Sequence, residues 1–278
     1  CIEGVGFNTA GEVSYANPNT ELTLYWNAGG LVTIQMHLQN PGYRVPANTG
    51  PLVEDDNNVR TDISDADFAN LSVPGNALYT KWLGPGYLKT VADGLQALKT
   101  AGVVVLFRPF HEMNINSFWW GDSTPTSART TAFIDLWRIT YDYLANIRGL
   151  TNLIWVYSVT PSGTDAIKTD YYPGGAYVDV VGLDTYRVET TWENNGLATG
   201  GYNALLTLNK PFYFSEIGPA TLNNQYNYQR VINAIQSYYG SAFGVLAWKS
   251  DYAFSANLNI TAVRDHAWSL LRDEVSIP

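Results

Sequence analysis

The residues best suited to chemistry follow a short apolar run in the middle of the chain. Val103–Phe107 is too short and too rich in β-branched residues for a helix, and it predicts a buried parallel strand. Polar and aromatic side chains then arrive together: Arg108, His111, Glu112, Asn114, Trp119 and Trp120. A carboxylic acid beside aromatic rings at a strand end could act as a general acid toward a sugar. The alternative is structural, with Glu112 capping a helix or pairing with Arg108.

A second glutamate ends another apolar run, Pro211–Glu216. Two carboxyl groups at one mouth, with Arg108 beneath them and aromatic rings around them, fit the hydrolysis of a glycosidic bond. In a retaining enzyme one carboxylate is the nucleophile, and the other group donates a proton and later accepts one. Arg108 would hold the nucleophile ionised, and a tryptophan face would stack on a sugar ring. Alternatively, both glutamates are ion-paired residues at the rim of the fold.

The elements that must position these residues alternate along the chain. Seven short apolar runs end in polar or aromatic residues: Ile2–Asn8, Leu31–His37, Val103–Phe110, Leu153–Ser158, Val178–Tyr186, Pro211–Glu216 and Gly244–Lys249. Helical periodicity lies between most of them, at Tyr87–Thr100, Thr130–Ile147, Tyr226–Tyr239 and Ala262–Leu271. Alternating strands and helices predict an α/β fold with a parallel sheet. Because the polar residues collect at strand carboxyl ends, we predict a (β/α)8 TIM barrel, as a single domain over residues 1–278.

The segment Asn40–Leu83 interrupts this alternation. It is rich in Pro, Asn, Asp and Gly and shows little periodicity. We interpret it as a long surface insertion on the face that carries the site. A disordered loop is the alternative.

Strand alternation predicts which side chains meet at the mouth of the barrel. Arg108, Phe110 and Glu112 occupy alternate positions, so they are expected on the same face of the strand. This places Arg108 one layer beneath the Glu112 carboxyl group. The same rule assigns three sets to shared faces: Thr33, Gln35 and His37; Gly182, Asp184 and Tyr186; and Phe212, Phe214 and Glu216. Six strands are therefore expected to project the following residues toward one mouth: His37, Glu112, Tyr157, Asp184, Tyr186, Glu216 and Trp248.

The composition limits the partners and the chemistry. The 278 residues carry a formal net charge of −9 without a cluster of Lys and Arg, which argues against nucleic acid and anionic membranes. No apolar run reaches the roughly 18 residues of a membrane span. The single cysteine, Cys1, excludes an intrachain disulfide. We expect no metal, because the three histidines are scattered along the chain. We expect no cofactor either, because the sequence has no P-loop and no dinucleotide-binding motif, and it also lacks a nucleophile elbow.

Several motifs resemble those of glycoside hydrolase family 26. Arg108–Asn114 with Phe118–Gly121 resembles the family's acid/base signature, and Val180–Tyr186 resembles its sixth-strand motif. Phe214–Gly218 resembles its nucleophile strand, and Leu246–Trp248 resembles its eighth strand. Gly29-Gly30, His37 and Asn40-Pro41 also match, so the likeness covers nearly the whole chain in the right order. The resemblance implies a clan A barrel with Glu112 as acid/base on strand four, Glu216 as nucleophile on strand seven, and retention of configuration.

The resemblance also implies a substrate. Most members of the family are endo-β-1,4-mannanases, and a minority cleave mixed-linkage β-1,3-1,4-glucan or β-1,3-xylan. The residues that we assign to substrate binding are His37, Arg108, His111, Trp119, Asp184, Tyr186 and Trp248. We expect a secreted monomer that degrades a mannan-type polysaccharide. A non-catalytic carbohydrate-binding barrel is the alternative from another functional class.

Two positions depart from the pattern of the family's mannanases. Ser117 stands where a tryptophan usually precedes the Phe-Trp-Trp-Gly run and stacks a sugar on the leaving-group side. Met36 stands where a tryptophan often precedes the strand-three histidine. Both departures put mannan specificity in question and leave the catalytic pair intact.

The family frame also predicts a strand count. If Glu112 ends strand four and His37 ends strand three, Ile2–Asn8 becomes strand two, and nothing after Trp268 resembles a strand. A barrel that lacks a strand has two open edges. We therefore expect the natural chain to have residues before Cys1.

Overall fold

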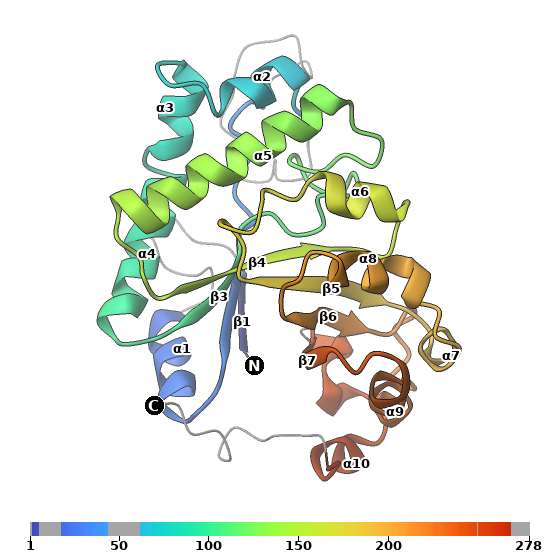
Figure 1. Ribbon diagram of the computed structural model, residues 1–278. Coiled ribbons are helices and arrows are strands. Elements are labelled where there is room, and N and C mark those ends of the chain that lie inside the picture. The colour runs from blue at the N-terminus through green and yellow to red at the C-terminus, as the bar shows by residue number, and fades with distance from the viewer. Residues whose placement is uncertain (1, 6–17, 44–61, 249, 268–278) are drawn as a thin grey trace.

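A computed structural model describes residues 2–5, 18–43, 62–248 and 250–267 of the chain. Its centre is one parallel sheet of seven strands, which lie in sequence order (Figure 1). The strands are β1 (Ile2–Val5), β2 (Val32–Gln35), β3 (Val105–Arg108), β4 (Leu153–Val159), β5 (Val180–Tyr186), β6 (Phe212–Gly218) and β7 (Ala242–Ala247). Each of the seven predicted runs overlaps a strand, although β4, β6 and β7 extend past the predicted bounds, and the predicted α/β class is confirmed. Residues 6–8 and 249 of those runs lie outside the described residues.

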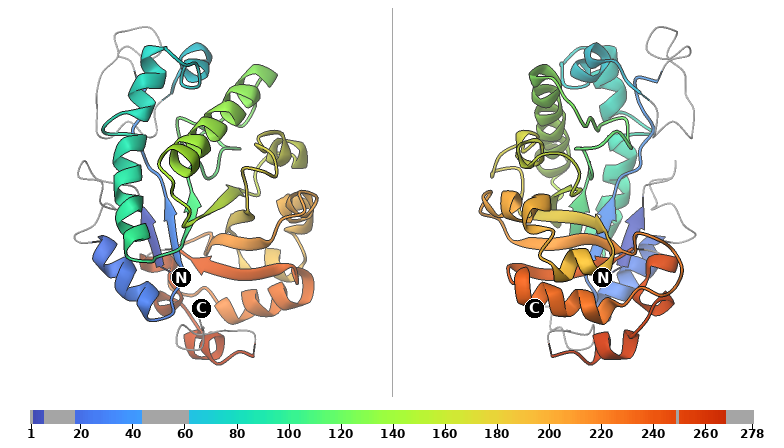
Figure 2. Two further views of the ribbon diagram at one scale, coloured as in Figure 1. Left: turned by 60° about the vertical axis from the view of Figure 1, so that its left-hand side comes forward. Right: turned by 90° about the vertical axis from the view of Figure 1, so that its right-hand side faces the viewer.

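The described strands form a half-barrel rather than the closed barrel that the sequence predicts. Within the described part of the chain, β1 pairs with β2, β7 pairs with β6, and no ladder joins β1 to β7. The strands fan round in Figure 2, with helices along the outside of the sheet. Closure by an eighth strand is therefore not seen in these residues.

Helices connect the strands and cover the outer face of the sheet. They are α1 (Pro18–Asn27), α2 (Asp65–Asn70), α3 (Ala77–Leu83), α4 (Leu88–Thr100), α5 (Ser127–Tyr141), α6 (Asp165–Asp170), α7 (Glu189–Glu193), α8 (Asn203–Leu206), α9 (Tyr228–Tyr238) and α10 (Ile260–Arg264). Two π-helical segments, Asp142–Ile147 and Ala198–Tyr202, and two 3-10 turns, Ser250–Tyr252 and Phe254–Ala256, complete the described elements. None of the described helices is long and apolar enough to cross a membrane.

The apolar stripes of the predicted helices explain how they pack. In α4 the side chains of Leu88, Val91 and Leu95 are fully buried against the sheet. The prediction for Thr130–Ile147 is confirmed as α5 with its π-helical extension, and Tyr226–Tyr239 as α9. Of the last predicted helix, Ala262–Leu271, residues 262–264 belong to α10, residues 265–267 form a turn after it, and residues 268–271 lie outside the described part.

The prediction of an irregular surface insertion over Asn40–Leu83 is wrong for the part that the structure describes. Two short helices, α2 and α3, begin there, because the side chains of Ser64 and Asn76 cap their first turns. Phe68 and Trp82 are fully buried. The indole N–H of Trp82 also donates to Thr140 Oγ1 of α5 at 3.2 Å, so this segment belongs to the core.

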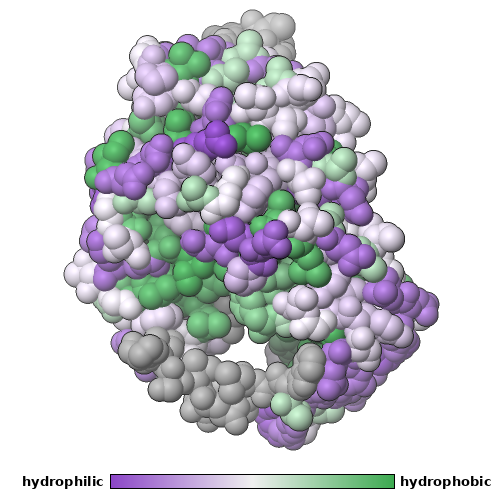
Figure 3. Space-filling view, viewed as in Figure 1, coloured by the Kyte–Doolittle hydropathy of each residue, from purple (hydrophilic) through white to green (hydrophobic). Residues whose placement is uncertain are grey.

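The two faces of the sheet are filled differently. The outer face joins the helices in one large apolar core. The inner face holds a small apolar cluster toward the amino ends of the strands: Leu106, Val156, Val180 and Tyr213. On the face in Figure 3, hydrophobic residues gather below α5, in the part of the view where the sheet lies.

Three predictions from strand alternation are wrong. Tyr157 points outward, where its hydroxyl donates to Lys168 O at 2.9 Å, so it does not reach the mouth. Phe110 lies beyond the end of β3 and packs against the rings of Trp82 and Trp137. A strand that is buried on both faces is apolar on both, so its sequence does not reveal which parity faces inward.

The third wrong prediction concerns β6, where Phe212 and Phe214 do not share a face with Glu216. The two phenylalanines pack outward against the rings of Tyr202 and Trp192. The register between β5 and β6 shifts before Glu216, because β6 accommodates one extra residue there. This irregularity turns Glu216 toward the inner face.

Candidate active site

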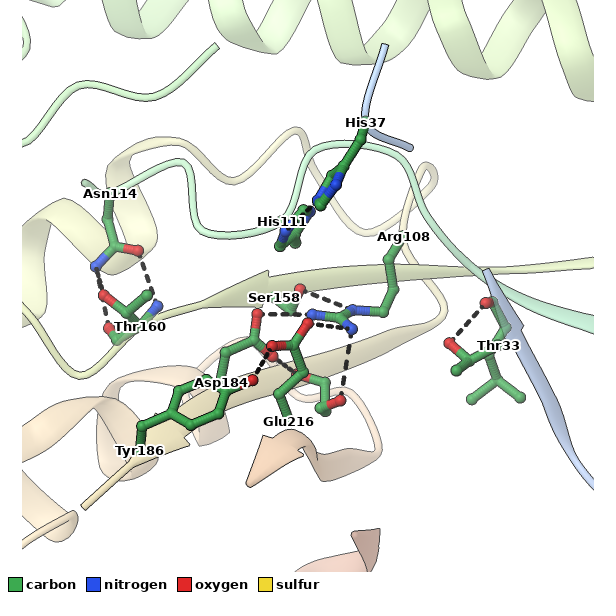
Figure 4. Close-up of polar contacts among 12 residues, drawn as sticks. Thr33, His37, Arg108, His111, Asn114, Ser158, Thr160, Asp184, Tyr186 and Glu216 are labelled. Carbon is green, nitrogen blue, oxygen red and sulfur yellow. Dashed lines mark hydrogen bonds and ion pairs between the residues drawn. The ribbon is translucent and has the colours of Figure 1, made fainter. Parts of the chain in front are cut away.

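Arg108, at the end of β3, is the centre of a buried polar cluster (Figure 4). Its Nη1 donates to Glu216 Oε1 at 3.0 Å, and its Nη2 donates to Asp184 Oδ2 at 2.6 Å. Its Nε donates to Ser158 Oγ at 3.2 Å. Arg108 is fully buried, and a buried guanidinium needs such partners to offset its lost hydration. One arginine therefore fixes carboxylates from two neighbouring strands, β5 and β6.

Asp184 is the deeper of these two carboxyl groups. Its Oδ1 accepts a hydrogen bond from Ser215 Oγ at 2.5 Å, and its side chain is fully buried. Burial raises the pKa of Asp184 to about 7, although the charge of Arg108 opposes this rise and the charge of Glu216 adds to it. A single guanidinium compensates only one of two carboxylates. The cluster therefore carries excess negative charge whenever both are ionised.

Glu216 is held at both oxygens. While Arg108 donates to Oε1, the hydroxyl of Tyr186 donates to Oε2 at 2.5 Å. Burial and the charge of Glu216 raise the pKa of Tyr186 far above its ordinary value, so its hydroxyl keeps its proton. The Tyr186 ring in turn packs edge-on against Trp248, with centroids 6.3 Å apart. These contacts fix the direction in which the Glu216 carboxylate points.

Glu112 lies in the loop that follows β3. Its φ of 54° is in the left-handed region, which is uncommon for a residue with a side chain. Its backbone N–H donates to Ser158 O at 3.0 Å, which fastens the loop to β4. One carboxylate oxygen from each of Glu112, Asp184 and Glu216 lies within 4.8 Å of the other two. Glu112 is partly exposed, whereas Glu216 is buried.

Those three carboxylates are also the group among the described residues that could coordinate a metal ion. Hard cations such as Ca²⁺ and Mg²⁺ prefer oxygen ligands of this kind. Arg108 already supplies a positive charge to Asp184 and Glu216 through its two ion pairs. A cation at this position would have to compete with the guanidinium for the same oxygens.

Aromatic rings surround His111, the residue that precedes Glu112. The Nε2 atoms of His37 and His111 are 3.3 Å apart, and their rings stack with centroids 5.1 Å apart. Phe118 packs against His111 and stacks on Trp120 at 4.6 Å. Figure 4 places the two histidines together, near the carboxylate cluster.

The structure places eight of the predicted site residues at the carboxyl ends of five strands. They are His37, Arg108, His111, Glu112, Asp184, Tyr186, Glu216 and Trp248. Trp119 lies elsewhere: it is 2% exposed, and its indole N–H donates to Leu38 O at 2.9 Å within the core. Contact between Trp119 and a sugar would require a ring face that the structure does not leave open.

Sequence reasoning missed two serines of the cluster. Ser158 accepts from Arg108, and Ser215 donates to Asp184. The signal was present, because each is a hydroxyl near the end of an otherwise apolar buried strand. A buried hydroxyl must find a hydrogen-bond partner, and here that partner is the charged cluster.

The family model for glycosyl hydrolase family 26 matches residues 9–274. The chain belongs to this family. A mannan endo-1,4-β-mannosidase of Bacillus subtilis (strain 168) is 37% identical over 260 residues, which are 92% of this chain and 66% of the relative. The match therefore covers just under two thirds of the length of that relative. The mannan endo-1,4-β-mannosidase A and B of Caldalkalibacillus mannanilyticus is 36% identical, over 96% of this chain and 49% of the relative.

Solved structures also resemble this family 26 chain. A Bacillus subtilis mannanase superposes with a TM-score of 0.83 at 32% identity, covering 99% of this chain and 78% of that one. A β-(1,4)-mannanase of Podospora anserina gives a TM-score of 0.66 at 26% identity, covering 94% of this chain and 54% of that one.

Proposed function

We propose that this chain is a retaining endo-β-1,4-mannanase, which hydrolyses mannan-type polysaccharides. The observation that carries the proposal is the geometry of its two glutamates. Oxygens of Glu112 and Glu216 approach within 4.8 Å. Retaining glycosidases place their carboxyl groups about 5–5.5 Å apart, whereas inverting ones need about 6.5–9.5 Å to admit a water molecule. The 37% identity to a mannan endo-1,4-β-mannosidase supports mannan as the polymer.

In the first step Glu216 is the nucleophile. Its carboxylate attacks the anomeric carbon, the glycosidic C–O bond breaks, and Glu112 donates its proton to the departing oxygen. Arg108 and Tyr186 favour this role, because their hydrogen bonds stabilise the charged carboxylate of Glu216 and orient it. The product of this step is a sugar ester of Glu216.

In the second step Glu112 acts as a base. It accepts a proton from a water molecule whose oxygen attacks the anomeric carbon, and the bond to Glu216 breaks. The electron pair returns to the Glu216 carboxylate, which Arg108 and Tyr186 again stabilise. Because each step inverts the anomeric carbon, the two together retain its configuration.

The other residues of the mouth would bind the sugars. Tyr186, whose hydroxyl binds Glu216, and Trp248 beside it offer aromatic surface at the nucleophile. The stacked rings of His37 and His111, the residue before Glu112, offer further contacts. In an eight-stranded barrel, β3 and β6 take the places of strands four and seven. We also propose that the enzyme is secreted, because its substrate is a polysaccharide.

The substrate alternatives are β-1,3-1,4-glucan and β-1,3-xylan. The observation that keeps them open is Ser117, a small residue where the family's mannanases usually stack a tryptophan on the sugar. Release of reducing sugar should be measured side by side on galactomannan, barley β-glucan and β-1,3-xylan. Glu216→Ala protein prepared in parallel controls for contaminating enzymes. We expect the fastest hydrolysis on mannan, and faster hydrolysis of barley β-glucan would overturn the mannanase proposal.

A further inference from the structure

Asn114, two residues after Glu112, is 1% exposed, and its amide is hydrogen-bonded through both its nitrogen and its oxygen. Its Nδ2 donates to Thr160 O at 3.0 Å, to Thr160 Oγ1 at 3.2 Å and to Ser162 O at 2.9 Å. Its Oδ1 accepts from the backbone N–H of Thr160 at 2.9 Å (Figure 4). Asn114 therefore ties the loop after β3, residues 109–126, to the chain that leaves β4.

Glu112 needs support from outside its own segment, because its φ of 54° is in the left-handed region. A residue with a side chain keeps such a conformation only where the surrounding structure holds it there. The backbone N–H of Glu112 donates to Ser158 O at 3.0 Å, and Trp120 Nε1 donates to His111 O at 2.8 Å. Asn114 adds an attachment on the carboxyl side of Glu112.

The end of β4 also supports the second glutamate, Glu216. Ser158 Oγ accepts from Arg108 Nε at 3.2 Å, and Arg108 Nη1 donates to Glu216 Oε1 at 3.0 Å. The two carboxyl groups are thus placed relative to each other through β4. None of the bonds on the side of Glu216 involves Asn114. Loss of the Asn114 amide should therefore displace Glu112 and leave the nucleophile in place.

We propose that Asn114 is a positioning residue for the acid/base, and that its amide fixes the direction from which Glu112 delivers its proton. The inference rests on the roles proposed above for Glu112 and Glu216. Proton transfer to the departing oxygen requires hydrogen-bond distance, and a misplacement of about 1 Å can cost about a hundredfold in rate. A leaving group that is already acidic departs with little help from that proton. The contribution of Asn114 should therefore be large on a polysaccharide and small on an activated aryl glycoside.

The test compares Asn114→Leu with the matched control Asn152→Leu. Leucine has the branching and nearly the size of asparagine, without polar atoms or charge. Asn152 immediately precedes β4, at the end of the strand away from the site, and its Nδ2 donates to Val103 O at 2.9 Å. Each substitution removes a side-chain amide that ties the chain near β3 to the chain near β4, and only one of these amides lies beside Glu112.

The values of kcat/KM are measured on galactomannan and on 2,4-dinitrophenyl β-mannobioside, with the same preparation of each variant. Their ratio does not depend on how much of the protein is folded. We expect Asn114→Leu to lower kcat/KM about a hundredfold on galactomannan and no more than about threefold on the aryl glycoside. Asn152→Leu should leave the ratio at the wild-type value, even where its Tm falls.

The second step gives an independent readout on the aryl glycoside. The kcat of Asn114→Leu should fall there, because Glu112 must accept a proton from the attacking water molecule. Azide needs no base, so it should restore this kcat.

Thr160→Val supplies a second variant, which removes one acceptor of the Asn114 amide and keeps the shape of the side chain. It should shift the ratio in the same direction by about two- to tenfold, as the loss of one hydrogen bond allows. If Asn114→Leu does not fold, an unchanged ratio in Thr160→Val overturns the inference.

Two outcomes for Asn114→Leu would also overturn it. Equal losses on both substrates would mean that Asn114 only stabilises the fold, and wild-type values on both would mean that Glu112 does not depend on it. Glu112→Ala, measured in parallel, separates these results from a failure of the proposed function. Equal losses on both substrates in Glu112→Ala would refute the acid role of Glu112 itself.

Discussion

Replacing Asp184 with asparagine should change how the free energy of unfolding depends on pH. Burial raises the pKa of this carboxyl from 3.8 to about 7 in the folded protein. Between about pH 4 and pH 7 the folded state holds a proton that the unfolded state has released. Stability therefore falls as the pH rises through this window, by at most about 1.4 kcal/mol per pH unit and about 4 kcal/mol in total. Below pH 4 both states are protonated, and above pH 7 the full cost applies.

The assay is urea unfolding, followed by tryptophan fluorescence, at several pH values between 4 and 8. The amide of the Asp184→Asn variant does not titrate, so the difference in unfolding free energy between this variant and the wild type should rise steadily from pH 4 to pH 7. Below pH 4, where Asp184 is protonated in both states, the variant differs from the wild type only by the constant effect of exchanging a carboxylic acid for an amide beside Arg108.

Asp93→Asn is the matched control for this titration. Hydrogen bonds from Arg148 and Lys89 lower the pKa of Asp93, so its contribution to stability is lost only below about pH 4. The difference between Asp93→Asn and the wild type should be flat from pH 4 to pH 7. A flat difference for Asp184→Asn as well would refute the reasoning, because it would mean that Asp184 is ionised throughout.

Four further substitutions test the site and the core. Glu216→Ala should lose nearly all turnover on every substrate, and retained activity in a reducing-sugar assay would exclude Glu216 as the nucleophile. Glu112→Ala should still form the intermediate from an aryl glycoside with a good leaving group, and azide should then release a β-glycosyl azide; absence of this product would count against its acid/base role. Ser117→Trp should tighten binding on the leaving-group side by about 1 kcal/mol, and unchanged kinetics on short oligosaccharides would contradict this. Trp82→Ala should lower the free energy of unfolding by about 3–5 kcal/mol, because the ring is fully buried, whereas a loss below about 1 kcal/mol would contradict the packing of α3 on α5.

The sequence was informative wherever polarity changes abruptly. Glu112 and Glu216 could both be predicted, because a carboxyl group at the end of a buried apolar run stands out in any parallel α/β fold. Strand alternation placed Arg108 beneath Glu112, and the chemistry of a retaining enzyme paired it with the nucleophile; the structure shows the contact with Glu216.

The sequence was uninformative where both faces of a strand are buried. Tyr157 and Phe214 are no more apolar than Val156 and Tyr213, which face inward beside them, so the face that each occupies depends on packing and on the extra residue in β6. Trp119 was assigned to the sugar because tryptophans often bind sugars, yet its indole N–H satisfies a core carbonyl.

The two short helices α2 and α3 were missed for a different reason. Their segment is rich in residues that usually mark loops, and each helix spans no more than two turns. The capping side chains of Ser64 and Asn76, followed by the buried rings of Phe68 and Trp82, were the available signals.

The most direct test of the proposed mechanism is to locate the covalent adduct. Wild-type protein should be incubated with a 2-deoxy-2-fluoro-β-mannobiosyl fluoride, digested with pepsin and mapped by tandem mass spectrometry. Double displacement predicts one added disaccharide on the peptide that contains Glu216, at that residue. An adduct on Glu112 or Asp184, or an enzyme that hydrolyses mannan without ever forming an adduct, would contradict the assignment of Glu216 as the nucleophile.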